Sequence, residues 1–173
     1  MKSQNNKNPQ KLTIALLVIY LIVLSWIILF KLQLDIRLLQ DTRLRSINFI
    51  PFAGSLIVNG KVELSEIILN IIVFIPFGVY MSMIFQNWGF FRKIVPIFTV
   101  SLLYEMMQYL FAIGASDITD LIGNTLGGVI GVAIYHILQR LLGIRTIKIL
   151  NILAAIGTIL IILFLGLLII ANM

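Results

Sequence analysis

The stretch Leu-Thr-Ile-Ala-Leu-Leu-Val-Ile-Tyr-Leu-Ile-Val-Leu-Ser-Trp-Ile-Ile-Leu-Phe, residues 12–30, carries no charged side chain. As a helix rising 1.5 Å per residue, it is long enough to cross the hydrocarbon core of a bilayer. It follows Lys2, Lys7 and Lys11, as the apolar part of a secretory signal would, but it exceeds the roughly 7–15 apolar residues of such a signal. No small-x-small cleavage site follows Phe30. The stretch therefore predicts an uncleaved transmembrane helix.

Four further apolar runs have spanning length, and the composition agrees with a membrane protein. The chain of 173 residues is 60% hydrophobic and 12% charged, with a mean hydropathy of +1.07, whereas soluble domains are about 25% charged. The sequence predicts an all-α integral membrane protein with a single domain over residues 1–173. This domain is a bundle of about five transmembrane helices, with a long outer loop (31–66) after the first; the later helices are expected at 67–85, 94–113, 121–138 and 149–171.

Basic residues predict the orientation, because they accumulate on the cytoplasmic side of membrane proteins. Eight of the 13 basic residues fall on one side when the N-terminus is cytoplasmic, and the loop 114–120 on the other side has none. The remaining five lie in the outer loop 31–66, where a long loop constrains orientation less. We expect a multi-pass protein of the bacterial cell membrane with its N-terminus inside and its C-terminus outside.

Residue types exclude several functions. The chain has no cysteine, so it has no disulfide, no Cys-ligated zinc or iron–sulfur site and no thiol nucleophile. The net charge of +6 is scattered between apolar spans, which favours membrane orientation over nucleic-acid binding. We expect no cofactor, no metal site and no nucleic-acid partner; the lipid bilayer is the expected environment.

Polar residues inside the spans are the candidate site. Burying such groups in hydrocarbon is costly, so they are expected to face the bundle and to have partners. Ser101, Glu105 and Gln108 have helical spacing and share one face of their helix. With Asn70, Asn124 and the acidic residues of the short outer loop, they gather in the outer half of the membrane. The predicted binding residues are Arg45, Asn70, Glu105, Gln108, Asp117, Asp120 and Asn124, with Glu105 at the centre.

Structural roles compete with binding for most of these residues. Asp117 and Asp120 are typical of a helix N-terminus, where acids accept hydrogen bonds from free backbone N–H groups. Asn70, Gln108 and Asn124 suit interhelical hydrogen bonds, each contributing about 1 kcal/mol. Glu105 differs, because a carboxylate at that depth must be protonated or paired with a cation.

Glycines predict the closest helix contact. Gly123, Gly127 and Gly131 form consecutive small-xxx-small steps, and Gly128 is adjacent. Such a face lets two helix backbones approach closely within a membrane.

The motifs together resemble the VanZ-like family of bacterial membrane proteins, named for a protein associated with teicoplanin resistance. They are Arg45-x-x-Asn48-x-x-Pro51-Phe52, Asn70-x-x-x-Phe74-x-Pro76-Phe77-Gly78, Glu105-x-x-Gln108 and Asp117-x-x-Asp120-x-x-x-Asn124-Thr125-x-Gly127. The resemblance covers about residues 43–135 and implies an envelope-associated role. Family members often carry an arginine shortly before the first aspartate, where this chain has Gly114-Ala115-Ser116. Arg45 is a candidate substitute for that arginine.

Two functions fit these observations. The first is a non-enzymatic envelope protein whose outer-facing pocket binds a lipid headgroup, a cell-wall precursor or a membrane-protein partner, and which contributes to glycopeptide resistance. The second is a membrane enzyme acting on a lipid or lipid-linked envelope substrate through Glu105, Asp117 and Asp120. The first is favoured because no nucleophile with an adjacent base is evident, and the only histidine, His136, is predicted to lie at the cytoplasmic end of its span.

The orientation can be tested with single cysteines, because the native chain has none. Ser116→Cys should react with a membrane-impermeant thiol reagent in intact cells, and Gln86→Cys should react only after the cells are permeabilised. Labelling of residue 86 in intact cells would reverse the orientation.

Overall fold

The computed structural model describes residues 7–30, 47–51, 65–111 and 116–171. The elements are α1 (Lys7–Phe30), β1 (Ile47–Asn48), α3 (Ser65–Ile84), α4 (Phe90–Phe111), β2 (Ser116–Asp117), α5 (Ile118–Leu142), the 3-10 turn η1 (Gly143–Arg145) and α6 (Thr146–Ala171). The all-α membrane class is confirmed. Within the described ranges, four continuous helical segments are long and apolar enough to cross a membrane.

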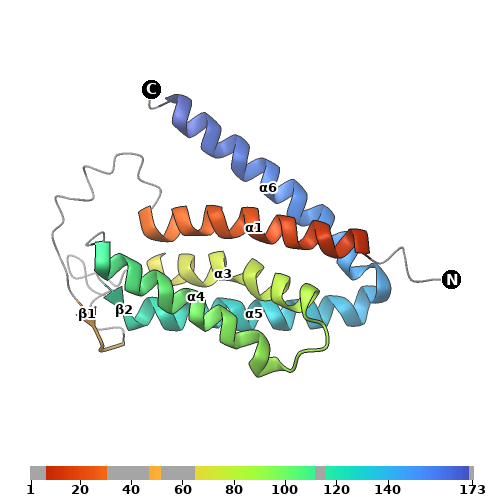
Figure 1. Ribbon diagram of the computed structural model, residues 1–173, viewed down its shortest axis with the longest axis horizontal. Helices are drawn as coiled ribbons and strands as arrows, with labels where there is room; N and C mark the ends of the chain where they lie inside the picture. The colour runs from red at the N-terminus through yellow and green to blue at the C-terminus, as the bar shows by residue number, and fades with distance from the viewer. Residues whose placement is uncertain (1–6, 31–46, 52–64, 112–115, 172–173) are drawn as a thin grey trace.

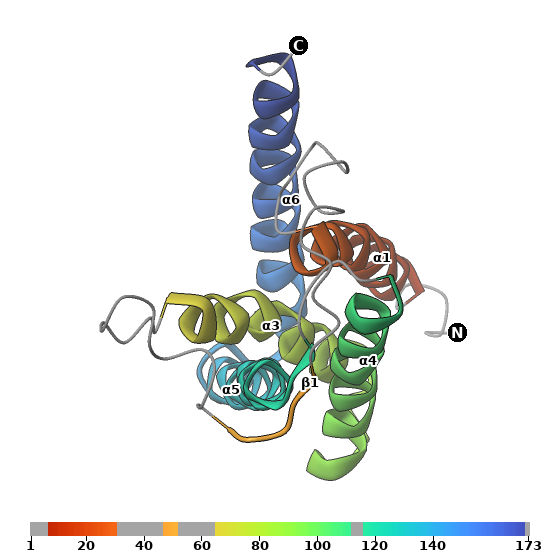
Figure 2. The same cartoon turned by 90° about the vertical axis from the view of Figure 1, so that its left-hand side faces the viewer.

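The number of spans differs slightly from about five because α5 and α6 follow each other through η1. Residues 118–167 therefore form one apolar helical stretch. The chain changes direction at Gly143, whose φ of 57° lies in the left-handed region that favours glycine. Thr146 continues the turn, because its hydroxyl donates to the Gly143 carbonyl at 2.8 Å. Figures 1 and 2 show α6 leaning away from the other four helices.

The other helices lie side by side and run in alternating directions, so the bundle has two distinct ends (Figure 1). One end holds the C-terminus of α1 and α4 and the N-terminus of α3 and α5; we call it the cavity end. The opposite end, called the basic end, carries Lys11, Arg92, Lys93, Arg140, Arg145 and Lys148. Lys93 was expected in a connecting loop, but it lies in the first turn of α4 and is only 1% exposed.

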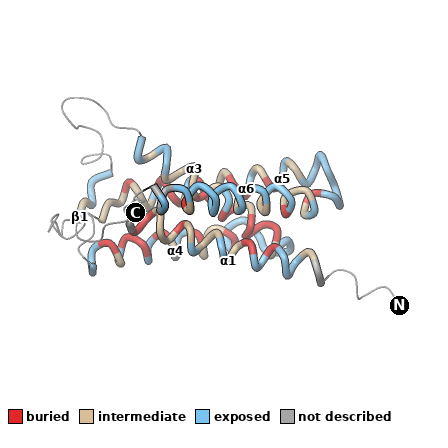
Figure 3. Tube along the Cα trace, turned by 90° about the horizontal axis from the view of Figure 1, so that it is seen from above, coloured by how far each residue is buried: buried red, intermediate tan, exposed pale blue. Residues whose placement is uncertain are grey.

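The core of the bundle is small and aromatic. Phe74, Ile97, Val132 and Leu24 are buried, and Phe74 packs edge to face with Tyr104 at 6.4 Å between ring centroids. Large apolar side chains cover the outside instead, and Figure 3 shows long exposed stretches on the outward sides of the helices. This distribution suits a protein whose surroundings are hydrocarbon, where exposed apolar side chains carry no penalty.

The tightest contact joins α3 and α5, and glycines make it possible. A Cβ atom added to Gly127 would lie 2.1 Å from the Ile71 carbonyl oxygen, and one added to Gly131 would lie 2.0 Å from that of Ile75. On the opposite helix, a Cβ on Gly78 would lie 2.0 Å from the Gly128 carbonyl oxygen. The predicted close approach is therefore present, and its partner is the backbone of α3.

Gly131→Ala should destabilise the protein in detergent, because the new methyl group meets backbone that cannot rotate away. Overpacking of this kind costs about 1–3 kcal/mol, or a fall in melting temperature of about 3–10 °C for a chain of this size. Gly157→Ala is the matched control, since a Cβ there meets nothing within 4 Å. Equal melting temperatures for the two variants would contradict the contact.

Candidate functional site

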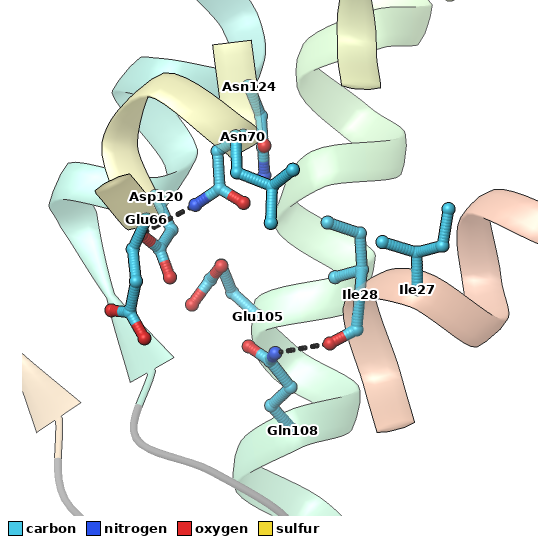
Figure 4. Close-up of a pocket in the computed structure, with 9 residues that line it drawn as sticks. Ile27, Ile28, Glu66, Asn70, Glu105, Gln108, Asp120 and Asn124 are labelled. Carbon is cyan, nitrogen blue, oxygen red and sulfur yellow. Dashed lines mark hydrogen bonds between the residues drawn. The ribbon is translucent and has the colours of Figure 1, made fainter. Parts of the chain in front are cut away.

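A cavity of about 260 Å³ lies at the cavity end of the bundle, among α1, α3, α4 and α5. Apolar side chains of α1 and α3 form part of its wall, and carboxylates and amides form the rest. The lining residues are Ile27, Ile28, Glu66, Leu69, Asn70, Glu105, Gln108, Asp120 and Asn124. Figure 4 shows the Glu105 carboxylate near the middle of this group.

The polar face of α4 points into the bundle, as its spacing predicts. Ser101, Glu105 and Gln108 are all buried. Gln108 Nε2 donates to the Ile28 carbonyl at 3.0 Å. The last carbonyls of a helix have no partner within the helix, so this contact satisfies one of them at the end of α1. Gln108 thereby joins α4 to α1.

Glu105 is held by the backbone of the next element. Its Oε2 accepts a hydrogen bond from the Asp117 N–H at 2.9 Å. Only 4% of Glu105 is exposed, so the bond replaces part of the hydration that a carboxylate loses on burial. The contact also fixes where α5 begins relative to α4.

Asp117 is the N-cap of α5. It is extended, with φ −123° and ψ 126°, and its Oδ1 accepts from the Thr119 N–H at 2.8 Å. Its Oδ2 accepts from Asn48 Nδ2 at 3.1 Å, and Asn48 pairs with Asp117 in the short parallel bridge of β1 and β2. The capping interpretation of Asp117 therefore describes its geometry, and Asn48 ties part of the predicted outer loop to this cap.

Two amides connect α5 to its neighbours. Asn70 Nδ2 of α3 donates to Asp120 Oδ1 at 2.8 Å, and Asn124 Nδ2 donates to Ser101 Oγ of α4 at 2.9 Å. Asn124 is 1% exposed. The polar groups thus form interhelical bonds and at the same time surround a space.

The predicted residues divide into three groups. Asn70, Glu105, Gln108, Asp120 and Asn124 line the cavity from three helices. Asp117 adjoins it through its N–H, and Arg45 lies outside the described residues. Their role in binding stays a prediction.

Glu66 is a lining residue that was assigned to the outer loop. It lies in the first turn of α3, which begins at Ser65 rather than after residue 66. The sequence did contain an indication of this position, because Glu66 precedes Asn70 by four residues and both therefore share one helix face. Ile27 and Ile28 gave no signal, because apolar residues on a spanning helix do not mark a pocket.

Fold and site together define a class: a small α-helical integral membrane protein with a cavity between its helices that is lined by both polar and apolar side chains. The VanZ/LLP1 family model matches residues 17–139. Protein VanZ of Enterococcus faecium is 40% identical over 126 residues, which cover 73% of this chain and 74% of that protein. No solved structure matches. The chain belongs to the VanZ-like family.

The cap geometry makes a prediction about Asp117. Asp117→Ala should lower the free energy of unfolding by about 1 kcal/mol or more, because N-cap replacements by alanine cost about that much. Asp117→Asn should lose less stability than alanine, since asparagine keeps an oxygen for the Thr119 N–H but leaves Asn48 Nδ2 without its acceptor. Thermal unfolding in detergent measures both. Equal destabilisation by alanine and asparagine would assign the effect to the charge rather than the cap.

Proposed function

We propose that this protein acts in the bacterial cell envelope, with its N-terminus in the cytoplasm and its cavity facing outside. There it binds a lipid headgroup, a cell-wall precursor or a membrane-protein partner, and it lowers susceptibility to teicoplanin-type glycopeptides. The observation that carries the proposal is the cavity of about 260 Å³, which is lined by the buried Glu105, by the less buried carboxylates Glu66 and Asp120, by amides and by apolar side chains.

The distribution of charge supports the outward-facing cavity. Basic side chains gather at the basic end, where α5 ends and α6 begins. By the positive-inside rule this end favours the cytoplasm, so the cavity end favours the outer surface. A ligand or partner from the cell wall would meet the cavity from that side.

The contacts favour binding over the alternative, an enzyme using Glu105, Asp117 and Asp120. Both carboxylate oxygens of Asp117 already accept hydrogen bonds, one from its own helix and one from Asn48. His136 is exposed and lies twelve residues beyond Asn124 on α5, about 18 Å along the helix axis. Neither residue is therefore placed to exchange protons with a ligand beside Glu105.

The link to antibiotic susceptibility follows from family membership. The match to the family model extends across α3, α4 and most of α5, which together carry the polar lining. The cavity therefore lies within the part of the chain that is shared with the family. This makes the cavity the first place to look for the family's activity.

Glu105→Gln tests the proposal, because glutamine keeps an oxygen that can accept the Asp117 N–H while it removes the charge. We expect normal membrane abundance and loss of the glycopeptide phenotype. The measurement is teicoplanin susceptibility of a strain that lacks the native gene and carries each variant at matched expression.

In that strain the wild-type gene defines full restoration of the teicoplanin phenotype, and the empty vector defines its absence. Thr99→Val serves as the control, since Thr99 is exposed on the same helix as Glu105 and its hydroxyl donates to the Val95 carbonyl of that helix. It should restore the phenotype. Full restoration by Glu105→Gln in a strain with a measurable phenotype would refute a functional role for the carboxylate.

A further inference from the structure

Lys93 is a cation buried between two helices at the basic end. It lies in the first turn of α4, and only 1% of it is exposed. It precedes Ile97 by four residues, so both side chains share one face of α4. That face packs on α5, because a Cβ atom on Gly128 would lie 2.5 Å from the Ile97 side chain. Long side chains in a helix point toward its N-terminus, which directs the Lys93 ammonium group to the basic end.

The ammonium group of Lys93 has no counter-ion within the described part of the chain. No hydrogen bond or ion pair of this group occurs among the described residues. The described acidic side chains lie at the cavity end, and along α4 Glu105 is twelve residues away, about 18 Å. A buried cation without an anion is strongly unfavourable. The position of Lys93 therefore favours an anion supplied from outside the chain.

An external anion can reach this group. The Lys93 nitrogen is not among the fully covered polar atoms that lack a partner in the described structure, so the exposed 1% includes the ammonium group. Its flexible four-carbon stem allows the group to move further outward. Membrane orientation does not account for the burial, because exposed basic residues such as Arg92 and Lys148 satisfy the positive-inside rule equally well.

His136 and Arg140 of α5 add two basic groups beside Lys93. His136 lies close enough to both Lys93 and Arg140 for their charges to act on it. Arg140 follows His136 by four residues, so the two share one face of α5, and both are exposed. A guanidinium group can donate to two oxygens of a phosphate, and an ammonium group adds a point charge with three donors. The combination suits a phosphate group.

An aromatic residue indicates the level of this site in the membrane. Trp88 is exposed in the turn between α3 and α4, five residues before Lys93, and its ring stacks on Phe85 at 4.0 Å between centroids. Tryptophan is enriched at the membrane–water interface, where lipid headgroups lie. Basic pockets between transmembrane helices on the cytoplasmic side bind anionic lipid headgroups in other membrane proteins. The surroundings of Lys93 therefore favour a phosphate carried by a lipid.

We propose that the basic end binds the phosphate group of an anionic phospholipid, with Lys93 at the centre of the site and His136 and Arg140 beside it. The site is separate from the cavity and from the function proposed for it. The assignment rests on the proposed orientation only in naming the cytoplasmic leaflet as the source of the lipid. Bound there, the phosphate joins the start of α4 to the later part of α5.

Lipid binding to the purified full-length chain, measured by native mass spectrometry in mild detergent, tests the assignment. The probes are phosphatidylglycerol and phosphatidylcholine with identical acyl chains, and inorganic phosphate. Phosphatidylcholine is the decisive comparison, because it carries the same phosphate but its headgroup has no net charge. We expect phosphatidylglycerol to bind about fivefold more tightly or better, since each basic residue near an anionic lipid surface contributes about that factor.

Variants locate the binding. Lys93→Met removes the charge at similar length and should abolish most of the preference for phosphatidylglycerol. Its melting temperature in lipid-free detergent should equal or exceed that of the wild type, because an uncompensated buried charge is gone. Lys148→Met is the matched control, since it removes the same charge from an exposed lysine at the same end; it should leave the preference unchanged. If Lys93→Met fails to fold, Arg140→Gln at an exposed position decides, and it should lower the preference severalfold.

The outcomes distinguish a built site from diffuse surface charge. A preference that falls with Lys93→Met or Arg140→Gln but not with Lys148→Met would support the assignment. Equal binding of the two lipids, equal losses for the two lysine variants, or a preference that survives both Lys93→Met and Arg140→Gln would overturn it. Inorganic phosphate binding as tightly as phosphatidylglycerol would overturn the lipid as the source and retain the phosphate chemistry. None of these results depends on the teicoplanin response of Glu105→Gln, which tests the cavity.

Discussion

The contact between the backbones of α3 and α5 is the constraint on which the rest of the structure depends. Glycines 78, 127 and 131 let the two helices approach so closely that a Cβ atom at any of them would lie about 2 Å from a carbonyl oxygen of the other helix. In a membrane, where lipid is as apolar as the side chains, such packing is a principal source of helix association. The same approach brings Asn70 and Asp120 within hydrogen-bond distance at one end of the pair.

Helix α4 completes the site because its polar face would be unfavourable against lipid and therefore packs against the other helices. Ser101, Glu105 and Gln108 would each lose hydration in hydrocarbon, and each instead contacts another element: α5, the Asp117 N–H and the end of α1. The contacts satisfy these groups only in part, since oxygens of Gln108 and Asn124 keep no partner.

Several properties of the site follow from elements that serve structure. Asp117 caps α5 and at the same time delivers its N–H to Glu105. Asn48 pairs with this cap, so a segment far away in sequence is attached beside the cavity. Changes at these positions would move Glu105 without touching a ligand. Substitutions around the cavity therefore need stability measurements beside any functional assay.

The sequence by itself determined the membrane class, the approximate helix limits, the polar face of α4 and the glycine face of α5. These features depend on hydropathy and helical periodicity, which are local properties of the chain. Hydropathy left Glu66 in the outer loop, although its four-residue spacing from Asn70 indicated a shared helix face. The sequence could not place Lys93 in the buried first turn of α4 or find the bridge between Ile47–Asn48 and Ser116–Asp117. Only the tertiary structure decided that α3 is the partner of the glycine face and that residues of α3, α4 and α5 line one cavity, because both depend on how helices far apart in sequence are rotated against one another.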